Sequence, residues 1–184
     1  MSIELEYMVI KKFYEGQHAQ RSGLPYIKHI DDGLKVLDAL GAEDRTKAAF
    51  CIHPIIQANE SLVESVETVA HLTEDPYVAI LATEYRRVAN SYLARNYTGE
   101  GDRDNIKLSP LKQVNDMLLA DKIQNRFDMV HYSPLQGTDR GEELLGYFDN
   151  WLAVLLQDRD VTVEELDEAI SESWCDHINA SHEE

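Results

Sequence analysis

The chain has 184 residues, of which 43% are hydrophobic and 28% charged, and its formal net charge is −17. This length and composition predict one folded domain over residues 1–178 with a frayed tail over 179–184, and they exclude global disorder. So acidic a chain repels phosphate backbones, which argues against DNA or RNA as a partner. A small nucleotide can still bind, because one local cation or metal ion outweighs the overall field.

Neither a membrane span nor a secretion signal is evident in the sequence. Its apolar runs fall short of the roughly 20 residues that a span needs, and the acidic start, Met1–Glu6, lacks the basic and apolar regions of a signal peptide. We therefore expect a cytoplasmic protein without a membrane partner. Cys51 and Cys175 lie in apolar helical contexts and are expected to be buried thiols. The oligomeric state stays open, a homo-oligomer included.

Helical periodicity runs through most of the chain. Ile30, Leu34 and Leu37 share one helical face, for example, and Gly41 is typical of the stop that follows such a helix. Useful period-two alternation is missing, so we expect an all-α, single-domain helical bundle. The expected helices cover about residues 3–19, 26–40, 42–56, 59–70, 75–92, 109–127, 142–156 and 163–174, with a polar loop at 97–107.

Pro54 interrupts the third of these helices. A proline inside a helix removes one backbone hydrogen bond and costs about 3 kcal/mol or more. We therefore predict that the helix ends or kinks at Pro54 and turns Gln57, one turn beyond His53, toward a pocket.

Two histidines and one aspartate stand on three separate predicted helices. His29, His53 and Asp121 offer imidazole nitrogen and carboxylate oxygen, which divalent metals bind together. Ligands on separate helices are a common way to build such a site in a bundle. Spacing alone leaves the alternative that each histidine is a hydrogen-bonded core residue.

The residues around these positions form three recognisable strings. They are RSGLPYIKH at 21–29, a small and apolar run that ends at His53, and LADKIQN at 119–125. In order and separation they resemble the HD superfamily of metal-dependent phosphohydrolases, closest to the RelA/SpoT-type alarmone hydrolases and their small stand-alone relatives. The resemblance covers roughly residues 10–130 and is thin across 60–105. It implies a helical fold, a divalent metal and a nucleotide substrate.

The resemblance also implies roles for individual residues. The metal ligands would be His29, His53 and Asp121, and the ion would be Mn or Zn rather than Mg. Arg21, Ser22 and Tyr26 would line the nucleotide side of the pocket, and Lys122 and Asn125 its far wall. Independently of the resemblance, we expect Lys28 to neutralise phosphate together with Arg21 and Lys122.

The chain departs from the family where the water is activated. Pro54 stands at the aspartate of the family's H-D pair, and Gln57 and Ala58 stand at its E-D pair. Gln57 can place a water molecule but is no base. A metal would then bind at an open site with three protein ligands, or no metal would bind.

A polar stretch over 84–92 lies within an otherwise core-forming helix. If this face meets His53, Glu84 is the carboxylate available as a general base, and Asn90 lies close to its side of the helix as a substrate contact. The alternative is a solvated helix in which Glu84 pairs with Arg87.

These observations leave three functions open. The leading one is an HD-like phosphohydrolase that cleaves a phosphoester or pyrophosphate bond in a nucleotide, with Glu84 or Gln57 placing the water. The second is an inactive descendant that still binds a nucleotide or a partner. The third is an adaptor whose acidic faces, around 64–67 and 164–172, meet a basic partner protein.

Overall fold

The computed structural model describes residues 3–19, 22–58 and 71–180, and the side chains of all of these except 58 and 172–180. Within these ranges the extended backbone amounts to one isolated bridge between His18 and Pro25. The prediction of an all-α fold is therefore confirmed. The helices are α1 (Glu4–Phe13), α2 (Ile27–Ala39), α3 (Asp44–Ala58), α5 (Pro76–Ala89), α6 (Lys112–His131), α7 (Asp139–Leu155) and α8 (Val163–Ala180), with the 3-10 helices η2 (Ala94–Asn96) and η3 (Glu100–Asn105).

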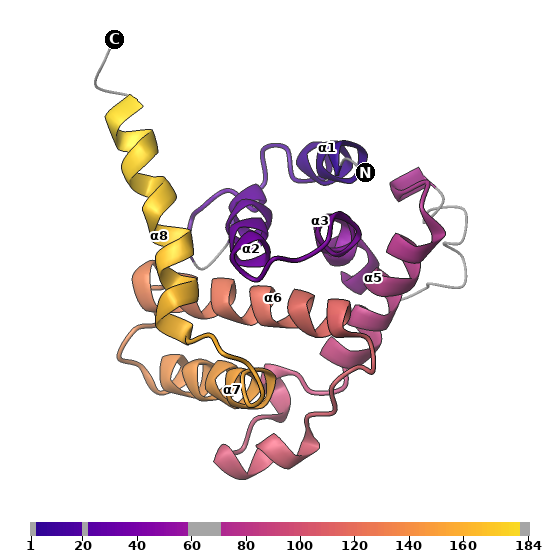
Figure 1. Cartoon of the computed structure of the whole chain (residues 1–184). Helices are drawn as coiled ribbons and strands as arrows, with labels where there is room; N and C mark the ends of the chain where they lie inside the picture. The colour runs from indigo at the N-terminus through magenta and orange to yellow at the C-terminus, as the bar shows by residue number, and fades with distance from the viewer. Residues whose placement is uncertain (1–2, 20–21, 59–70, 181–184) are drawn as a thin grey trace.

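Helix α6 is the central element of the bundle (Figure 1). Helices α2, α3 and α5 pack along one side of it, α7 packs on the opposite side, and α8 contacts both α2 and α6. The middle of α6 is buried all round, as expected of a helix enclosed by others: Met117 and Leu119 are fully inaccessible to solvent. Asp121 and Lys122 continue this stretch and are only 6% and 5% exposed, so two charged side chains lie inside the bundle.

Helices α2 and α3 approach closely because Gly33 has no side chain. A Cβ atom at Gly33 would lie 2.2 Å from the ring of Phe50, far inside the optimal carbon–carbon separation. Phe50 is fully buried at this contact. His29 stands one turn before Gly33, and His53 stands one turn after Phe50. The contact therefore sets the two histidines opposite each other.

Several helices begin at the capping signals in the sequence. Asp75 accepts a hydrogen bond from the backbone N–H of Tyr77 (2.9 Å) at the start of α5. Thr162 and Glu165 accept hydrogen bonds from each other's backbone N–H groups at the start of α8, which is the reciprocal pattern of a capping box. These local signals placed both starts correctly.

Other predicted boundaries were wrong. The helix expected over 3–19 ends at Phe13, because the chain turns through Gly16 in the left-handed region (φ 72°). The loop expected at 97–107 contains η3, and α5 ends at Ala89 rather than continuing through Tyr92. Helix α8 continues to Ala180, since neither glycine nor proline occurs in it. The helix expected over 59–70 lies outside the described residues.

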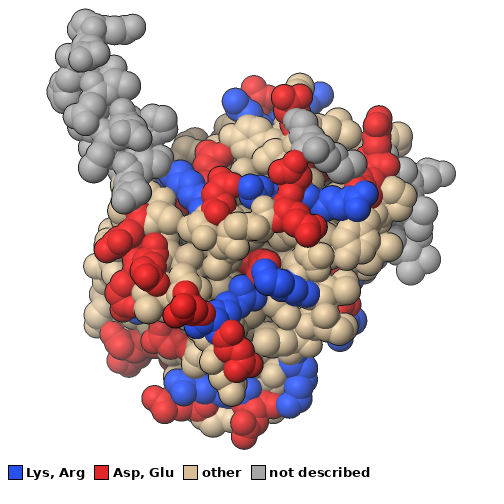
Figure 2. Space-filling view, in the orientation of Figure 1, with Lys and Arg blue, Asp and Glu red and all other residues tan. Residues whose placement is uncertain are grey.

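The surface carries charges of both signs. Acidic side chains are spread over the face in Figure 2 and are interrupted by lysines and arginines. Of the two acidic faces considered for a basic partner, 64–67 lies outside the described residues, whereas Glu164, Glu165 and Glu168 at the start of α8 are exposed. No helix in the described ranges is long and apolar enough to cross a membrane.

Cys51 is a buried free thiol, as predicted. Burial, with the charges of Glu6 and Asp31, raises its pKa to about 12, so the thiol stays protonated and unreactive at neutral pH. The side chain of Cys175 lies outside the described part of the chain.

Candidate metal centre

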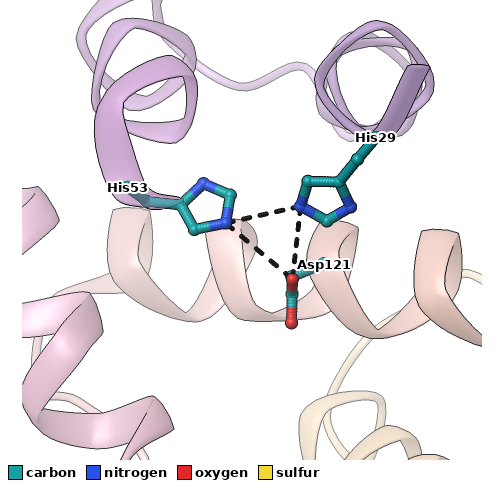
Figure 3. Close-up of side chains that lie close together, drawn as sticks. All are labelled: His29, His53 and Asp121. Atoms are coloured by element: carbon teal, nitrogen blue, oxygen red, sulfur yellow. Dashed lines mark hydrogen bonds and ion pairs between the residues drawn. The ribbon is translucent and has the colours of Figure 1, made fainter. Parts of the chain in front are cut away.

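His29, His53 and Asp121 converge at one point between α2, α3 and α6 (Figure 3). The two imidazole rings project from neighbouring helices toward the carboxylate on α6. The Nε2 atoms of the histidines are 3.4 Å apart, and Asp121 Oδ1 lies 3.5 Å from His29 Nε2 and 3.9 Å from His53 Nε2. Among the described residues, this is the group of three metal-ligating side chains whose donor atoms all lie within 4.8 Å of one another. The predicted convergence is confirmed.

The other ring nitrogen of His53 is held by the backbone. Its Nδ1 atom lies 2.5 Å from the carbonyl oxygen of Phe50. In an α-helix that carbonyl would accept from the backbone N–H of residue 54, but Pro54 has none. The proline thus leaves the Phe50 carbonyl free to accept the Nδ1 hydrogen, and the lone pair of His53 falls on Nε2, which faces the cluster.

The side chain of Gln124 holds the Nδ1 atom of His29 in the same way as the Phe50 carbonyl holds that of His53. Its Oε1 atom lies 2.5 Å from His29 Nδ1. An amide oxygen only accepts, so Nδ1 carries the hydrogen and the lone pair falls on Nε2. A hydrogen bond on the ring nitrogen opposite the ligating one is the usual support of a metal-binding histidine, because it fixes the tautomer and the ring orientation.

The donor set fits a divalent ion. Two neutral imidazole nitrogens and one carboxylate oxygen form a set that Zn and Mn accept. Donors about 2.1 Å from a tetrahedral ion lie about 3.4 Å from one another, close to the 3.4–3.9 Å observed here. Once both histidines carry their hydrogen on Nδ1, three lone pairs face one another. These lone pairs repel one another, and a cation between them relieves the repulsion.

The charges around the cluster keep the histidine neutral and the aspartate ionised. Burial, and then the charge of His29, lower the pKa of His53 to about 3. Burial opposes ionisation of Asp121, but the charges of Lys122, His29 and His53 outweigh it and lower its pKa to about 2. Lys122 Nζ lies 2.6 Å from Asp121 Oδ2, and it also lies over the rings of Tyr147 and Trp151. Both metal-competent protonation states are therefore present at neutral pH.

A cavity of about 400 Å³ opens beside the cluster. Besides the three donors, it is lined by five of the residues predicted to act on substrate or water: Ser22, Tyr26, Gln57, Lys122 and Asn125. Helix α3 does not end at Pro54, since it continues to Ala58, but Gln57 lines the cavity as predicted.

Glu84 is not part of this cavity, contrary to the expectation that it meets His53. Its carboxylate accepts from Arg87 Nε and Nη2 at 2.7 Å each and from Ser109 Oγ at 2.8 Å, away from the cluster. The next residue, Tyr85, faces His53 instead, with ring centroids 4.6 Å apart. One residue is a rotation of about 100° on a helix, so the face that meets His53 starts one position later than expected.

Two further residues predicted to bind substrate, Lys28 and Asn90, do not line the cavity in the described structure. Lys28 pairs with Asp32 on its own helix. Asn90 is exposed and accepts a hydrogen bond from Gln57 Nε2 at 3.3 Å, so it touches the site through one side chain. Arg21 lies outside the described residues.

The structure adds three residues to those predicted to bind metal, substrate or water. Gln124 and Asp128 line the cavity, and both share the helical face of Asp121 at i+3 and i+7, a signal that was available. Tyr85 is fully buried against His53, and nothing in its local sequence indicates this. Burial and the charge of Asp121 raise the pKa of Tyr85 well above its usual value. The buried atoms Tyr85 Oη, Gln124 Nε2 and Asp128 Oδ1 make no hydrogen bond of standard geometry in the described structure, although Asp121 interacts with Tyr85 and Gln124 with Asp128 closely enough to shift the pKa values of Tyr85 and Asp128.

No protein-family model, curated protein or solved structure matches this chain. The fold and the site define it as an all-α bundle with a His–His–Asp cluster at the wall of a cavity.

Proposed function

We propose that this protein is an HD-like, metal-dependent phosphohydrolase that cleaves a phosphoester or pyrophosphate bond in a small nucleotide. One observation carries the proposal: His29, His53 and Asp121 bring their donor atoms within 4.8 Å, while the Nδ1 atoms of both histidines are occupied by other acceptors. A merely structural histidine pair does not need both rings presented with their lone pairs toward one carboxylate. The resemblance of the surrounding strings to the HD superfamily supports the same function.

Different residues of the cavity would bind the metal ion, orient water and add positive charge. His29, His53 and Asp121 would hold a divalent ion, which would supply a lower pKa of bound water and polarisation of a phosphoryl oxygen. Gln57 lines the cavity and would orient water through its amide, with Asn90 holding the amide nitrogen. Lys122 would keep Asp121 ionised and add positive charge beside the phosphoryl group.

A second candidate is a nucleotide-binding protein without turnover. This candidate is favoured because neither position predicted to activate water supplies a general base to the cavity. Glu84 is engaged with Arg87 and Ser109 outside the cavity, and Gln57 stands where the HD superfamily has an acidic residue. General-base assistance typically contributes 10²–10⁴-fold to a rate, so an enzyme that lacks it would be slow unless another carboxylate serves.

The test combines metal analysis, turnover and binding. Elemental analysis of the purified protein is paired with a nucleotide-hydrolysis panel in added Mn²⁺ for wild type, His53→Ala and Glu84→Gln. The enzyme predicts bound metal and turnover that His53→Ala abolishes, while Glu84→Gln, the control carboxylate outside the cavity, retains turnover within about twofold. Tight nucleotide binding without turnover at saturating Mn²⁺ would favour the second candidate. Absence of both binding and turnover would reject both.

A further inference from the structure

The side-chain amide of Gln124 decides the tautomer of His29, because its two ends have opposite hydrogen-bonding roles. With Oε1 toward His29 Nδ1, as observed at 2.5 Å, Nδ1 carries the hydrogen and the Nε2 lone pair faces His53 and Asp121. A half-turn of the amide would present its N–H₂ group instead, and the hydrogen of the ring would move to Nε2. The metal-competent form of His29 therefore depends on the group that fixes the direction of this amide.

The nitrogen end of the amide is buried on the side of Asp128. Gln124 is only 1% exposed, and its Nε2 donor makes no hydrogen bond of standard geometry in the described structure, as is also true of the buried acceptor Asp128 Oδ1. The two residues stand four positions apart on α6, a spacing at which side chains are neighbours and Gln–Asp pairs form hydrogen bonds. Because one atom is a donor and the other an acceptor, a small rotation of either side chain satisfies both.

The electrostatics of Asp128 agree with a contact to this amide. Burial raises the pKa of Asp128, and the contact with Gln124 opposes that rise more strongly than the charges of Lys28 and His29 do. The charge of Asp32 adds to the rise. An ionised carboxylate only accepts hydrogen bonds, so it attracts the N–H₂ end of the amide and repels the oxygen.

Resting on the metal site of the proposed function, we propose that Asp128 is a positioning residue for His29. Its carboxylate accepts from Gln124 Nε2, and Gln124 Oε1 in turn accepts from His29 Nδ1, so that Asp128 acts on the metal ligand through one intervening side chain. Asp128 touches neither the ion nor its donor atoms in this role. The support of His29 thus extends from α2 to a residue two turns beyond Asp121 on α6, and both Gln124 and Asp128 line the cavity.

Two variants of Asp128 separate its hydrogen bond from its charge. Asp128→Asn keeps an oxygen acceptor for Gln124 and removes the charge, whereas Asp128→Leu removes both. In the metal-free full chain, the ¹⁵N chemical shifts of the His29 ring should show the hydrogen on Nδ1 in wild type and in Asp128→Asn, and a shift toward Nε2 in Asp128→Leu. Zn²⁺ affinity, titrated calorimetrically, should fall about tenfold in Asp128→Leu and stay within about threefold of wild type in Asp128→Asn.

Gln124→Glu supplies a matched background, because both ends of a carboxylate are oxygen and His29 Nδ1 then meets an acceptor in either direction. In that background Asp128→Leu should leave the hydrogen of His29 on Nδ1 and the Zn²⁺ affinity within about threefold of Gln124→Glu alone. Thermal unfolding checks that each variant is folded. Asp128→Ala, a smaller side chain without an acceptor, carries the same expectation as Asp128→Leu if leucine prevents folding.

An unchanged His29 tautomer and wild-type Zn²⁺ affinity in Asp128→Leu would overturn the inference. Equal losses of affinity in Asp128→Leu and Asp128→Asn would also overturn it, because they indicate an effect of charge alone, and so would an undiminished loss in the Gln124→Glu background. The proposed function stands in all three cases. If wild type binds neither Zn²⁺ nor Mn²⁺, the proposed function fails instead, and the tautomer of His29 in the metal-free protein still decides whether Asp128 directs it.

Discussion

The Nδ1 atom of His29 lies 2.5 Å from the Oε1 atom of Gln124, although 95 positions separate the two residues in the chain. The contact orients the imidazole and directs its lone pair to His53 and Asp121. Gln124 is only 1% exposed, so water cannot readily replace it.

We therefore expect Gln124→Met, which keeps the volume and removes the acceptor, to weaken Mn²⁺ or Zn²⁺ binding about 10–100-fold. Isothermal titration measures the affinity, and thermal unfolding checks that the variant is folded. Thr46→Val serves as the control, because it also removes a buried polar atom but lies outside the cavity. Equal metal affinity in wild type and Gln124→Met would show that His29 does not depend on this bond.

Pro54→Ala should separate stability from metal binding. The new backbone N–H at position 54 can donate to the Phe50 carbonyl and restore a helical hydrogen bond, which is worth up to about 3 kcal/mol. It also competes with His53 Nδ1 for that carbonyl, so metal affinity should fall about tenfold.

The readouts are urea unfolding, metal titration, and the ¹⁵N chemical shifts of the His53 ring, which distinguish its tautomers. Pro110→Ala, at an exposed proline before α6, is the matched control. A more stable Pro54→Ala variant with wild-type metal affinity and an unchanged His53 tautomer would contradict the role of the free carbonyl.

Gly33→Ala should separate α2 from α3. The added methyl group would lie 2.2 Å from the Phe50 ring, so the helices must move apart even though alanine favours the helix itself. We expect a loss of about 1–3 kcal/mol in the free energy of unfolding, with weaker metal binding as His29 moves away from His53.

The double variant Gly33→Ala/Phe50→Leu removes the ring that clashes and should recover part of the metal affinity. A Gly33→Ala variant as stable as wild type, with unchanged metal binding, would mean that the helices adjust without moving the histidines.

Acid should destabilise the metal-free protein through His53. Its pKa is lowered to about 3 in the folded state, against about 6.5 in an unfolded chain, so the unfolded state binds more protons between these values. Stability therefore falls as the pH drops below about 6.5, by up to about 1.4 kcal/mol per pH unit from this group.

Urea unfolding at several pH values between 6.5 and 4.5 measures the slope. Asp121 does not interfere there: its lowered pKa adds stability that is present above the unfolded value of about 3.9 and is lost only as the pH falls toward about 2. His53→Gln should flatten the slope, and an equal slope in both proteins would show that His53 does take up a proton in the folded state.

The sequence by itself determined the helical class and the residues of the His–His–Asp cluster. Periodicity and caps are local, so the starts of α5 and α8 and the all-α class could be predicted from neighbouring residues. The strings around His29, His53 and Asp121 indicated that three distant segments serve one site, and the structure brings those residues together.

Only the tertiary structure decided how the helices are rotated and what lies between them. A rotation of one residue on α5 places Tyr85 rather than Glu84 against His53, and periodicity does not resolve so small a difference when both neighbours are partly polar. Gln124 and Asp128 share the helical face of Asp121, but only the tertiary structure shows that this face lines a cavity and that Gln124 contacts His29 on α2. Pro54 looked like a missing ligand, yet its lack of an N–H frees the carbonyl that orients His53. Packing, which depends on contacts far apart in the chain, sets each of these outcomes.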